Sequence, residues 1–362
     1  MPRKLPATTV GVALAAAVLA IAACGTAGNS SLAPAPKNPD AKVTGTLRTF
    51  TYDDTIAPDL FDNFKKQNPD LDVQSATFDS DSEAAAKLAG GFRADVVEVC
   101  ADEIDPLLAR NLLRPIDTKG VPAFGRLAFR NSPGIRNAKG QVMFVPLQAG
   151  PQGLIVNTKE IPNPPDSWKA LFDPAYKGRV ALEGDEPLTP IGETALAMGM
   201  KDPMGLSDGE VSRVQDYLTA HTDQFRSYTQ SDPDTVNLLK SGEVVLTDGG
   251  RGTAVQAQKA GVPVKWVAPK EGALSWVCGL GIPADSANIP AAYKMINYYT
   301  SPHTQAQSAQ AGYVALNPAA LPFVPPAYKA TANPAVLANA IPERQPDNFQ
   351  NYVHAWQEVQ TR

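Results

Sequence analysis

The sequence predicts an α/β fold built from two domains. Extended apolar segments alternate with helical segments in a β-α-β-α-β-α order, which is typical of a mainly parallel sheet with helices on both faces. The 362 residues exceed the size of one typical domain. The pattern also changes over residues 142–157, where two extended pieces follow each other without a helix between them. We therefore expect a second α/β unit after this point.

The first unit begins with a strand over residues 47–52. Pro58 then opens a helix that places Leu60, Phe61 and Phe64 on one face, and the turn after Asn68 ends it. The remaining elements expected here are strands over residues 71–75 and 95–99, with helices over residues 83–88 and 104–109.

Residues 143–146 and 153–157 form the two extended pieces at the change of pattern. Beyond them we expect strands over residues 178–182, 244–247, 263–267 and 276–283. The expected helices cover residues 191–198, 208–221, 234–239, 253–259, 290–299 and 351–360. No internal repeat is visible in the sequence.

The N-terminus reads as a secretory signal that ends at a lipidation site. Arg3 and Lys4 precede an apolar stretch over residues 10–23, and small residues stand directly before Cys24. This arrangement resembles a bacterial lipoprotein signal, in which Cys24 would receive the lipid; the alternative is an ordinary signal peptide with an incidental cysteine. We expect cleavage after residue 23 and a flexible, Pro- and Ser-containing tether over residues 24–43. The mature chain would then be held at the outer face of a membrane or in the periplasmic space.

Composition excludes several classes of function. A formal net charge of −5 argues against a nucleic-acid partner, because binding to phosphates needs a basic face. Three His and three Cys argue against a rich metal site or a disulfide scaffold, so we expect no cofactor and no metal. The three His are far apart in sequence, and no HExxH, GxSxG or P-loop motif is present, so we expect no enzyme activity.

Several segments resemble a known family in their order and spacing. Residues 168–178 (WKALFDPAYKG) resemble the W-x-x-L-x-x-P-x-Y-K-G segment of extracellular solute-binding proteins of ABC importers. Residues 241–246 (SGEVVL) are similar to the x-G-E-V strand that precedes a binding loop in this family. Residues 266–272 (WVAPKEG) and 281–284 (GIPA) are similar to the spermidine/putrescine-binding branch, as are residues 294–299 (KMINYY). The resemblance covers roughly residues 44–362.

That family implies a two-lobed clamshell of the type II periplasmic-binding-protein kind, whose lobes are mixed, mainly parallel sheets flanked by helices and joined by hinge strands. Lobe I would comprise residues 44–150 and 276–320, and lobe II residues 151–275 and 321–362. The hinge crossings would lie near residues 146–153, 276–282 and 316–323. The resemblance further implies a monomer that takes a small solute between its lobes, closes around it and delivers it to an ABC permease.

In the first lobe, the resemblance places ligand contacts at the ends of strands. Tyr52, Asp53 and Asp54 follow the first strand and match an aromatic and acidic pattern of the family. Asp102 follows the strand that ends at residue 99, where the family more often has a ring. The alternative role for these aspartates is helix capping.

In the second lobe and the hinge, the candidates are Asp185, Asp248, Arg251, Trp276 and Gln345. Tyr313 matches an aromatic residue of the first lobe. The alternatives are a solvated turn for Asp185, a surface ion pair for Arg251 and a purely structural core role for Trp276. Cys100 and Cys278 would meet beneath the cleft, either as a disulfide or as two buried free thiols.

The acids at the expected loop ends favour a cationic solute, most simply a polyamine. They are Asp53, Asp54, Asp79, Asp102, Asp185 and Asp248. A polyamine needs carboxylates for its ammonium groups and rings for its methylenes. Two departures favour a different solute with an anionic end, such as an aminophosphonate, an opine or a sugar: the family's Trp is Gly250 here, and its key acid is Cys278. Arg251 would attract such an anion, so both ligand classes stay open.

Overall fold

A computed structural model of the protein describes residues 31–362. The expected signal segment, Cys24 and the start of the expected tether lie outside the described residues. The strands are β1 (Gly45–Thr51), β2 (Leu71–Thr77), β3 (Val96–Cys100), β4 (Leu113–Arg114), β5 (Phe144–Asn157), β6 (Val180–Glu183), β7 (Phe225–Thr229), β8 (Leu246–Gly250), β9 (Val264–Val267), β10 (Leu274–Pro283) and β11 (Ile341–Pro342). The α-helices are α1 (Pro58–Gln67), α2 (Asp81–Ala89), α3 (Asp105–Ala109), α4 (Leu188–Ala197), α5 (Asp208–Ala220), α6 (Asp232–Ser241), α7 (Arg251–Lys259), α8 (Ile289–Tyr299), α9 (Pro302–Gln310), α10 (Lys329–Ala332) and α11 (Phe349–Gln360).

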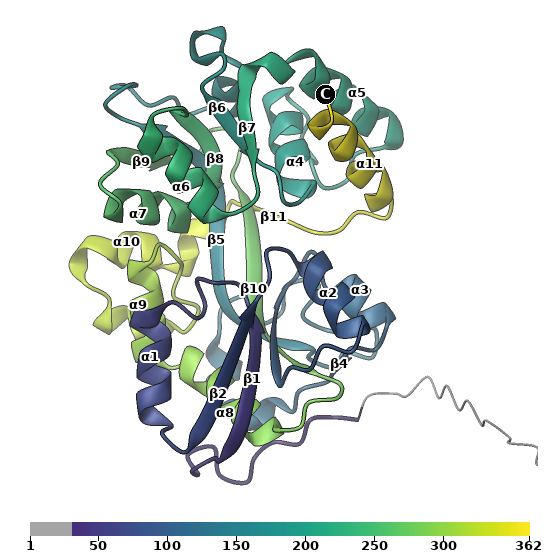
Figure 1. The fold of residues 1–362 in the computed structure, drawn as a ribbon, viewed down its shortest axis with the longest axis vertical. Coiled ribbons are helices and arrows are strands. Elements are labelled where there is room, and N and C mark those ends of the chain that lie inside the picture. Colours follow the sequence, from purple (N-terminus) through teal and green to yellow (C-terminus); the bar gives the residue numbers. More distant parts are fainter. Residues whose placement is uncertain (1–30) are drawn as a thin grey trace, which may run out of the picture.

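The predicted α/β fold with two lobes is confirmed (Figure 1). Strands pair in the order β2-β1-β3-β10-β5-β8-β6-β7, so the sheets of the two lobes are continuous through β10 and β5. Within each lobe the outer strands are parallel, whereas β10 and β5 run antiparallel to their neighbours. Each sheet is therefore mixed and mainly parallel.

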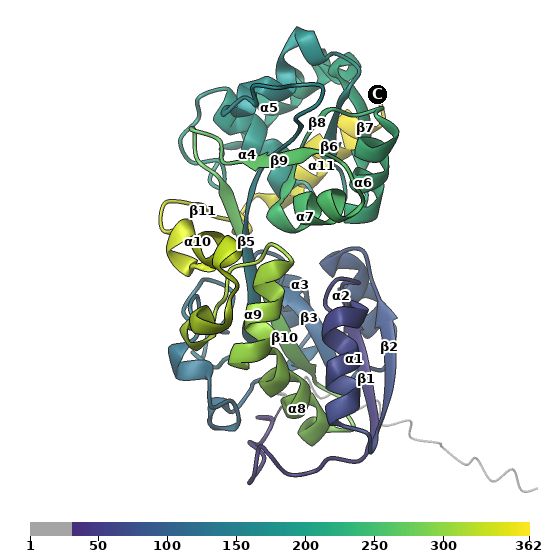
Figure 2. The ribbon, with the colours of Figure 1, turned by 90° about the vertical axis from the view of Figure 1, so that its left-hand side faces the viewer.

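Lobe I is a sheet covered on both faces. The α1 and α8 helices pack on one face, where the rings of Phe64 and Tyr298 lie 5.3 Å apart, and α2 and α3 cover the other (Figure 2). The core contains the apolar residues that the strand and helix patterns predicted, including Leu47, Phe50 and Val97, each fully buried. This packing holds the carboxyl ends of β1 and β3 in place facing lobe II.

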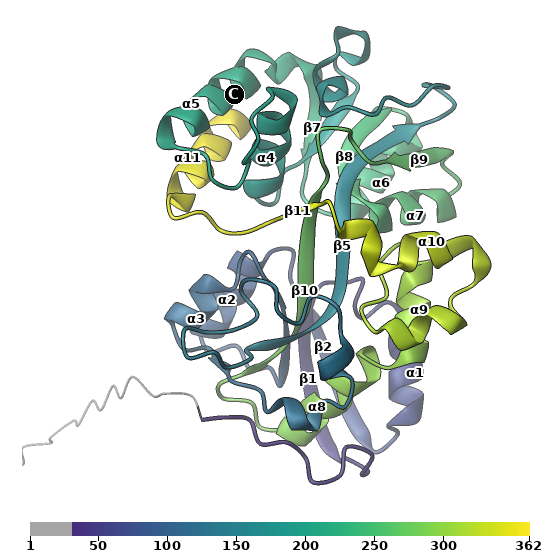
Figure 3. The same cartoon turned by 180° about the vertical axis from the view of Figure 1, so that it is seen from behind.

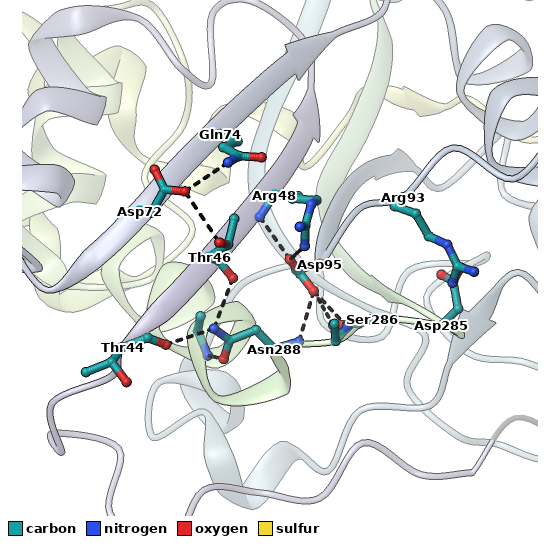
Figure 4. A network of polar contacts seen from close by, with 12 residues as sticks. Thr44, Thr46, Arg48, Asp72, Gln74, Arg93, Asp95, Asp285, Ser286 and Asn288 are labelled. Atoms are coloured by element: carbon teal, nitrogen blue, oxygen red, sulfur yellow. Dashed lines mark hydrogen bonds and ion pairs between the residues drawn. The ribbon is translucent and has the colours of Figure 1, made fainter.

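Asp95 fixes the connection between β10 and α8 to the far end of lobe I (Figure 4). Its Oδ1 accepts hydrogen bonds from the Ser286 hydroxyl and from the backbone N–H groups of Ala287 and Asn288. Its Oδ2 accepts the backbone N–H of Arg48 at 2.9 Å, in β1. One buried carboxylate thus joins β1 to the loop that follows β10, and it sets the register of the hinge strand against lobe I.

Lobe II repeats the layered arrangement. On one face α6 packs with α7, and on the other α4, α5 and α11 pack together (Figure 1). Trp168 and Trp356 contribute the largest apolar surfaces to the core under α4 and α5. The C-terminal helix α11 therefore belongs to lobe II. Residues 321–362 were all expected in this lobe, and α11 is one part of that range.

Two long strands pass between the lobes (Figure 3). All fourteen residues of β5 are buried, and the strand pairs first with β10 and then with β8 and β9. Sequence patterning divided β5 into two pieces because Pro146 and Pro151 interrupt it. Both prolines instead lie inside the strand, and each faces a residue of β10 in the ladder.

The third crossing lies later in the chain than expected. Residues 321–337 pack with α9 of lobe I, in a cluster that includes Ala309, Ala320, Val324 and Ala332. The chain enters lobe II only at β11, which pairs with the start of β10. The expected boundary at residue 320 and the expected crossing near residues 316–323 are therefore corrected to about residues 338–343. The small apolar residues of this segment were too weakly patterned to assign.

The expected tether is also shorter than residues 24–43. Ala33 is fully buried, and its backbone pairs with that of Pro115 and Asp117. Its carbonyl accepts the hydroxyl of Tyr293, and Lys294 donates to the carbonyls of Pro39 and Ala41. Residues 33–41 are thus docked on lobe I, because these contacts satisfy backbone groups that a free tether would leave to water.

The structure joins Cys100 and Cys278 in a disulfide between β3 and β10. Of the two possibilities left open by the sequence, the structure has the bonded one. In the described part of the chain, no helix combines the length and apolar character needed to cross a membrane.

We predict that this disulfide stabilises lobe I and the hinge. Replacing Cys100→Ser and Cys278→Ser together removes a link across a sequence separation of 178 residues. The unfolded chain then gains conformational freedom, so the free energy of unfolding should fall by about 2–5 kcal/mol. Chemical denaturation of the variant beside the oxidised parent measures this change. Reduced parent protein is the control, and equal stability of oxidised parent and double variant would contradict the prediction.

Candidate functional site

A cavity of about 390 Å³ lies between the lobes. Its walls come from the loops at the carboxyl ends of the parallel strands β1, β2 and β3 in lobe I and β6, β7 and β8 in lobe II, together with β5, β10 and residue 343 after the third crossing. This is the edge at which open α/β sheets bind ligands. Ten of the lining residues carry carboxyl groups: Asp53, Asp54, Asp79, Asp102, Glu103, Glu183, Asp185, Glu186, Asp232 and Glu343. Among the described residues that line the cavity, none is Lys, Arg or His.

The wall of lobe I is organised by hydrogen bonds among its acids and rings. Tyr313 donates its hydroxyl to Asp54, and Tyr52 donates to Asp81 at 3.0 Å. Glu98 is fully buried below them and accepts the Nε2 group of Gln148 at 2.7 Å. The side chains at the end of β1 are therefore held in fixed positions by groups behind them.

The wall of lobe II is organised in the same way. Asp248 is fully buried, and its carboxylate accepts the backbone N–H of Glu183 at 2.9 Å. Glu186 accepts the backbone N–H groups of Leu188 and Thr189, and so caps the start of α4. Asp232 stands at the start of α6 and accepts hydrogen bonds from Thr253 and Gln256 of α7.

The carboxyl groups form two clusters, and each cluster takes members from both lobes. The first carboxyl cluster consists of Asp53 and Asp54 of lobe I and Asp232 of lobe II. The second carboxyl cluster consists of Asp102 and Glu103 of lobe I, Asp185 and Glu186 of lobe II, and Glu343 after the third crossing. Like charges thus face each other across the cavity at two places.

Burial and this repulsion raise the pKa values of the facing groups. Burial, followed by repulsion from Glu186 and Asp81, raises the pKa of Asp102 to about 7. Burial, with repulsion from Asp54 and Asp53, raises the pKa of Asp232 to about 6 although two side chains donate to it. The empty cavity therefore retains protons that a bound cation would displace.

Aromatic rings lie between the carboxyl groups. Trp276 of β10 and Tyr313 meet edge to face, with ring centroids 5.8 Å apart. The Trp276 ring lies over Gly150 of β5, where a Cβ atom would come within 2.8 Å of it. A glycine at this point lets the indole lie against the strand and present its surface to the cavity.

Most of the predicted site residues line this cavity. They are Tyr52, Asp53, Asp54, Asp79, Asp102, Asp185, Trp276 and Tyr313, with Cys100 and Cys278 in the floor. Two β-α-β lobes therefore bring together residues from positions 52 to 313, as expected from strand ends meeting at one edge.

Three predicted residues do not line the cavity. Asp248 lies below it, where it binds the backbone of Glu183. Gln345 follows Glu343 but is not part of the wall. Arg251 is 9 % exposed at the start of α7, with its guanidinium carbon 5.6 Å from the centre of the Trp266 ring, and burial lowers its pKa to about 10. The arginine packs against this ring instead of facing the carboxyl groups.

Sequence reasoning missed several residues of the wall: Glu103, Gln148, Gln152, Glu183, Glu186, Asp232 and Glu343. Glu183 and Glu186 belong to a loop from which only Asp185 was chosen. Asp232 follows β7, a strand that was not predicted because its residues alternate too weakly. The two glutamines lie inside β5, and Glu343 follows the third crossing, whose position was wrong.

Comparisons with known proteins agree with this architecture. The family profile described as bacterial extracellular solute-binding protein matches residues 59–337. The spermidine/putrescine-binding periplasmic protein of Escherichia coli is 26% identical over 295 residues, which cover 78% of this chain and 80% of that protein.

Two solved structures share the fold. A spermidine/putrescine ABC transporter substrate-binding protein from Streptococcus pneumoniae, in complex with calcium and HEPES, matches with a TM-score of 0.71 and 20% identity, over 88% of this chain and 99% of that one. A binding protein from A. tumefaciens in complex with agropinic acid matches with a TM-score of 0.66 and 22% identity, over 88% of this chain and 97% of that one. The profile match, which spans most of the chain, shows that this protein belongs to the bacterial extracellular solute-binding proteins.

Proposed function

We propose that this solute-binding protein captures a linear polyamine of the spermidine or putrescine kind between its lobes and delivers it to an ABC permease. The observation that carries the proposal is a cavity with ten carboxyl side chains in its wall and no basic side chain among the described residues that line it. The names of the matched relatives from Escherichia coli and Streptococcus pneumoniae support the same ligand class.

A polyamine meets the physical demands of this cavity. Its ammonium groups would take the place of the protons between facing carboxyl groups, as charge-assisted hydrogen bonds are stronger than neutral ones. Its methylene segments would lie against Trp276, Tyr313 and Tyr52. Each cation–π contact between one of these rings and a neighbouring ammonium group would contribute about 0.5–2 kcal/mol. Both chemical parts of the ligand thus find matching partners.

The cation also provides a reason for closure. In the empty protein, Asp102 and Glu186 repel each other across the cavity, as do Asp54 and Asp232. A ligand with charges at both clusters removes this repulsion only when the lobes are together. It therefore binds the closed state more tightly, which is the condition for a ligand to shift the equilibrium.

A solute with an anionic end is the second candidate. It is favoured by the structural likeness to the binding protein from A. tumefaciens with agropinic acid. The acidic wall weighs against it, because an anion would add to the repulsion there. Arg251, the cation nearest in sequence to the β8 strand end, packs on Trp266.

We further propose that the mature chain is a monomer anchored outside the cytoplasm through lipid on Cys24. The sequence before Cys24 supports this proposal by its resemblance to a lipoprotein signal. The docked residues 33–41 leave only a short connection between the lipid and lobe I. The body would then stay close to the membrane that holds the permease.

Titration with a panel of amines and anions tests the ligand class. Spermidine and putrescine should raise the melting temperature and produce a saturable heat signal in calorimetry, because they bind the folded state only. Agropinic acid, inorganic phosphate and simple sugars serve as the contrasting set. A response to the anions alone would overturn the amine assignment.

Trp276→Ala should weaken amine binding by about 5- to 30-fold, which corresponds to about 1–2 kcal/mol for one lost ring contact. Calorimetric titration with spermidine measures the change. Phe323→Ala removes an exposed ring that does not line the cavity, and it serves as the control. Unchanged affinity in Trp276→Ala would remove this ring from the site.

Amine binding should weaken as the pH falls from 8 to 6. The pKa of about 7 means that Asp102 takes up a proton in the empty cavity as the pH falls through 7, and Asp232, with a pKa of about 6, does so near pH 6. The ammonium groups must displace these protons. Each proton released per ligand lowers the affinity by about tenfold per pH unit below the pKa of the group. Affinities from titrations at pH 6, 7 and 8 at constant ionic strength measure the slope.

The empty protein should show the opposite trend in stability. A carboxyl group whose folded pKa is raised contributes stability that is present below its unfolded pKa near 4 and is lost as the pH rises through 6 to 7. Its melting temperature should therefore be higher at pH 5 than at pH 8, and the increase caused by spermidine should be larger at pH 8. A pH-independent amine affinity would contradict the assignment of these carboxyl groups to the ligand.

A further inference from the structure

Gln152 has a buried acceptor that no group among the described residues 31–362 uses. The residue lies in β5, lines the cavity and is 7 % exposed. Its Nε2 group donates to Glu183 Oε2 at 2.8 Å, whereas its Oε1 atom is buried without a hydrogen-bond partner. A buried acceptor in this state is costly unless something else supplies the hydrogen. In a ligand site, a ligand N–H group or a bound water molecule supplies it.

The bond to Glu183 sets the orientation of the amide. Nε2 of Gln152 donates to Glu183, which leaves Oε1 on the other side of the amide. The direction of the free acceptor is thus fixed by the wall of lobe II.

Gly250 leaves space beside this acceptor. It faces Gln152 in the ladder between β5 and β8 and also lines the cavity. A Cβ atom at Gly250 would lie 3.5 Å from Gln152 Oε1, with no closer neighbour. The backbone there, with φ −69° and ψ 160°, suits any residue. The absence of a side chain therefore serves no backbone need, and it opens room for a ligand group next to Oε1.

This room adjoins Gln152, whose partner Glu183 lies near members of both carboxyl clusters. Glu183, to which Gln152 is bonded, feels the charge of Asp232 in the first cluster and those of Asp185 and Glu186 in the second. A ligand whose ends reach both clusters must pass this point with its middle. Gln152 is then placed to contact the middle of the ligand.

We propose that Gln152 Oε1 accepts an N–H bond from the inner ammonium of a linear triamine, and that Gln152 and Gly250 together make the cavity prefer a triamine to a diamine. The inference rests on the proposed function and adds the specificity-determining residue. A diamine presents methylene groups at this point and leaves Oε1 buried without a partner. Sites built around a buried polar group discriminate strongly against analogues that lack the matching group.

A neutral amide suits this position better than another acid. The wall already holds carboxyl groups on both sides, and an additional charge would increase the repulsion in the empty cavity. An amide oxygen accepts from an ammonium without adding to that repulsion. It also cannot take up a proton near neutral pH, so its acceptor stays available.

The test compares spermidine, a triamine, with putrescine, a diamine, in calorimetric titrations of the full mature chain. Gln152→Met keeps the length of the side chain and removes the amide. We expect it to weaken spermidine binding by about tenfold and putrescine binding by less than about threefold, so that the preference for the triamine shrinks. Gln258→Met makes the same change at a residue of α7 that does not line the cavity and should leave both affinities unchanged.

Gly250→Ala is the second variant and leaves the bond between Gln152 and Glu183 in place. The added methyl group occupies the space beside Oε1, so spermidine should again lose more affinity than putrescine. This variant decides the matter if Gln152→Met does not fold, as judged by circular dichroism.

Each outcome supports or overturns the inference. Equal losses for both amines would assign Gln152 to the positioning of Glu183 alone, and unchanged affinities would mean that water satisfies Oε1; both results overturn it. Failure of the parent protein to bind either amine would reject the proposed function itself. Selective loss of spermidine binding in Gly250→Ala and Gln152→Met supports the inference.

Discussion

Carboxyl groups of like charge face each other across one cavity, and the behaviour of the two lobes depends on this arrangement. The facing groups Asp102 and Glu186, and likewise Asp54 and Asp232, resist both ionisation and close approach when nothing lies between them. Protons can relieve the repulsion, and so can a ligand with two or more positive charges. On the proposed function, charge would couple three events that are otherwise separate: solute capture, proton release and closure. The groups proposed to bind the solute would oppose closure in its absence, which would give the protein a means to distinguish its loaded from its empty state.

This coupling needs rigid walls and a compliant connection, and the fold provides both. Hydrogen bonds from behind hold the acids of each wall, as with Asp248 below Glu183 and Gln148 above Glu98. The disulfide between Cys100 and Cys278 ties the end of β3 to the hinge strand, and Asp95 ties the other end of that strand to β1. The lobes are connected through β5, β10 and the segment near β11. This connectivity would let the angle between the lobes change while the hydrogen bonds within each wall stay in place.

The sequence predicted the parts of this structure that depend on local pattern. Strong alternation and helix starts such as Pro58 placed most elements within a few residues, and the acids directly after β1 and β3 followed from those strand ends. Three kinds of feature were not predicted correctly from the sequence. A long buried strand with two internal prolines was divided, since Pro usually marks an end. The third crossing was misplaced because residues 321–337 are small and weakly patterned, and Glu343 was missed with it. Arg251 was expected to face the ligand, but only tertiary packing could reveal that Trp266 takes its guanidinium.

Charge alone gives such a cavity affinity for many cations but little power to choose among them, because every linear polyamine carries ammonium groups that carboxylates accept. Discrimination must come from features that a wrong ligand leaves unsatisfied. The spacing of the two carboxyl clusters sets the length of ligand that can reach both. The aromatic pair Trp276 and Tyr313 favours ligands that have apolar segments between their charges. The neutral acceptor of Gln152, held in a fixed direction by Glu183, adds a requirement on the chemistry of the middle of the chain. In a wall with ten acids, a neutral acceptor such as Gln152 Oε1 would distinguish ligands by the chemistry of their middle part, because it gains nothing from a positive charge placed elsewhere in the cavity.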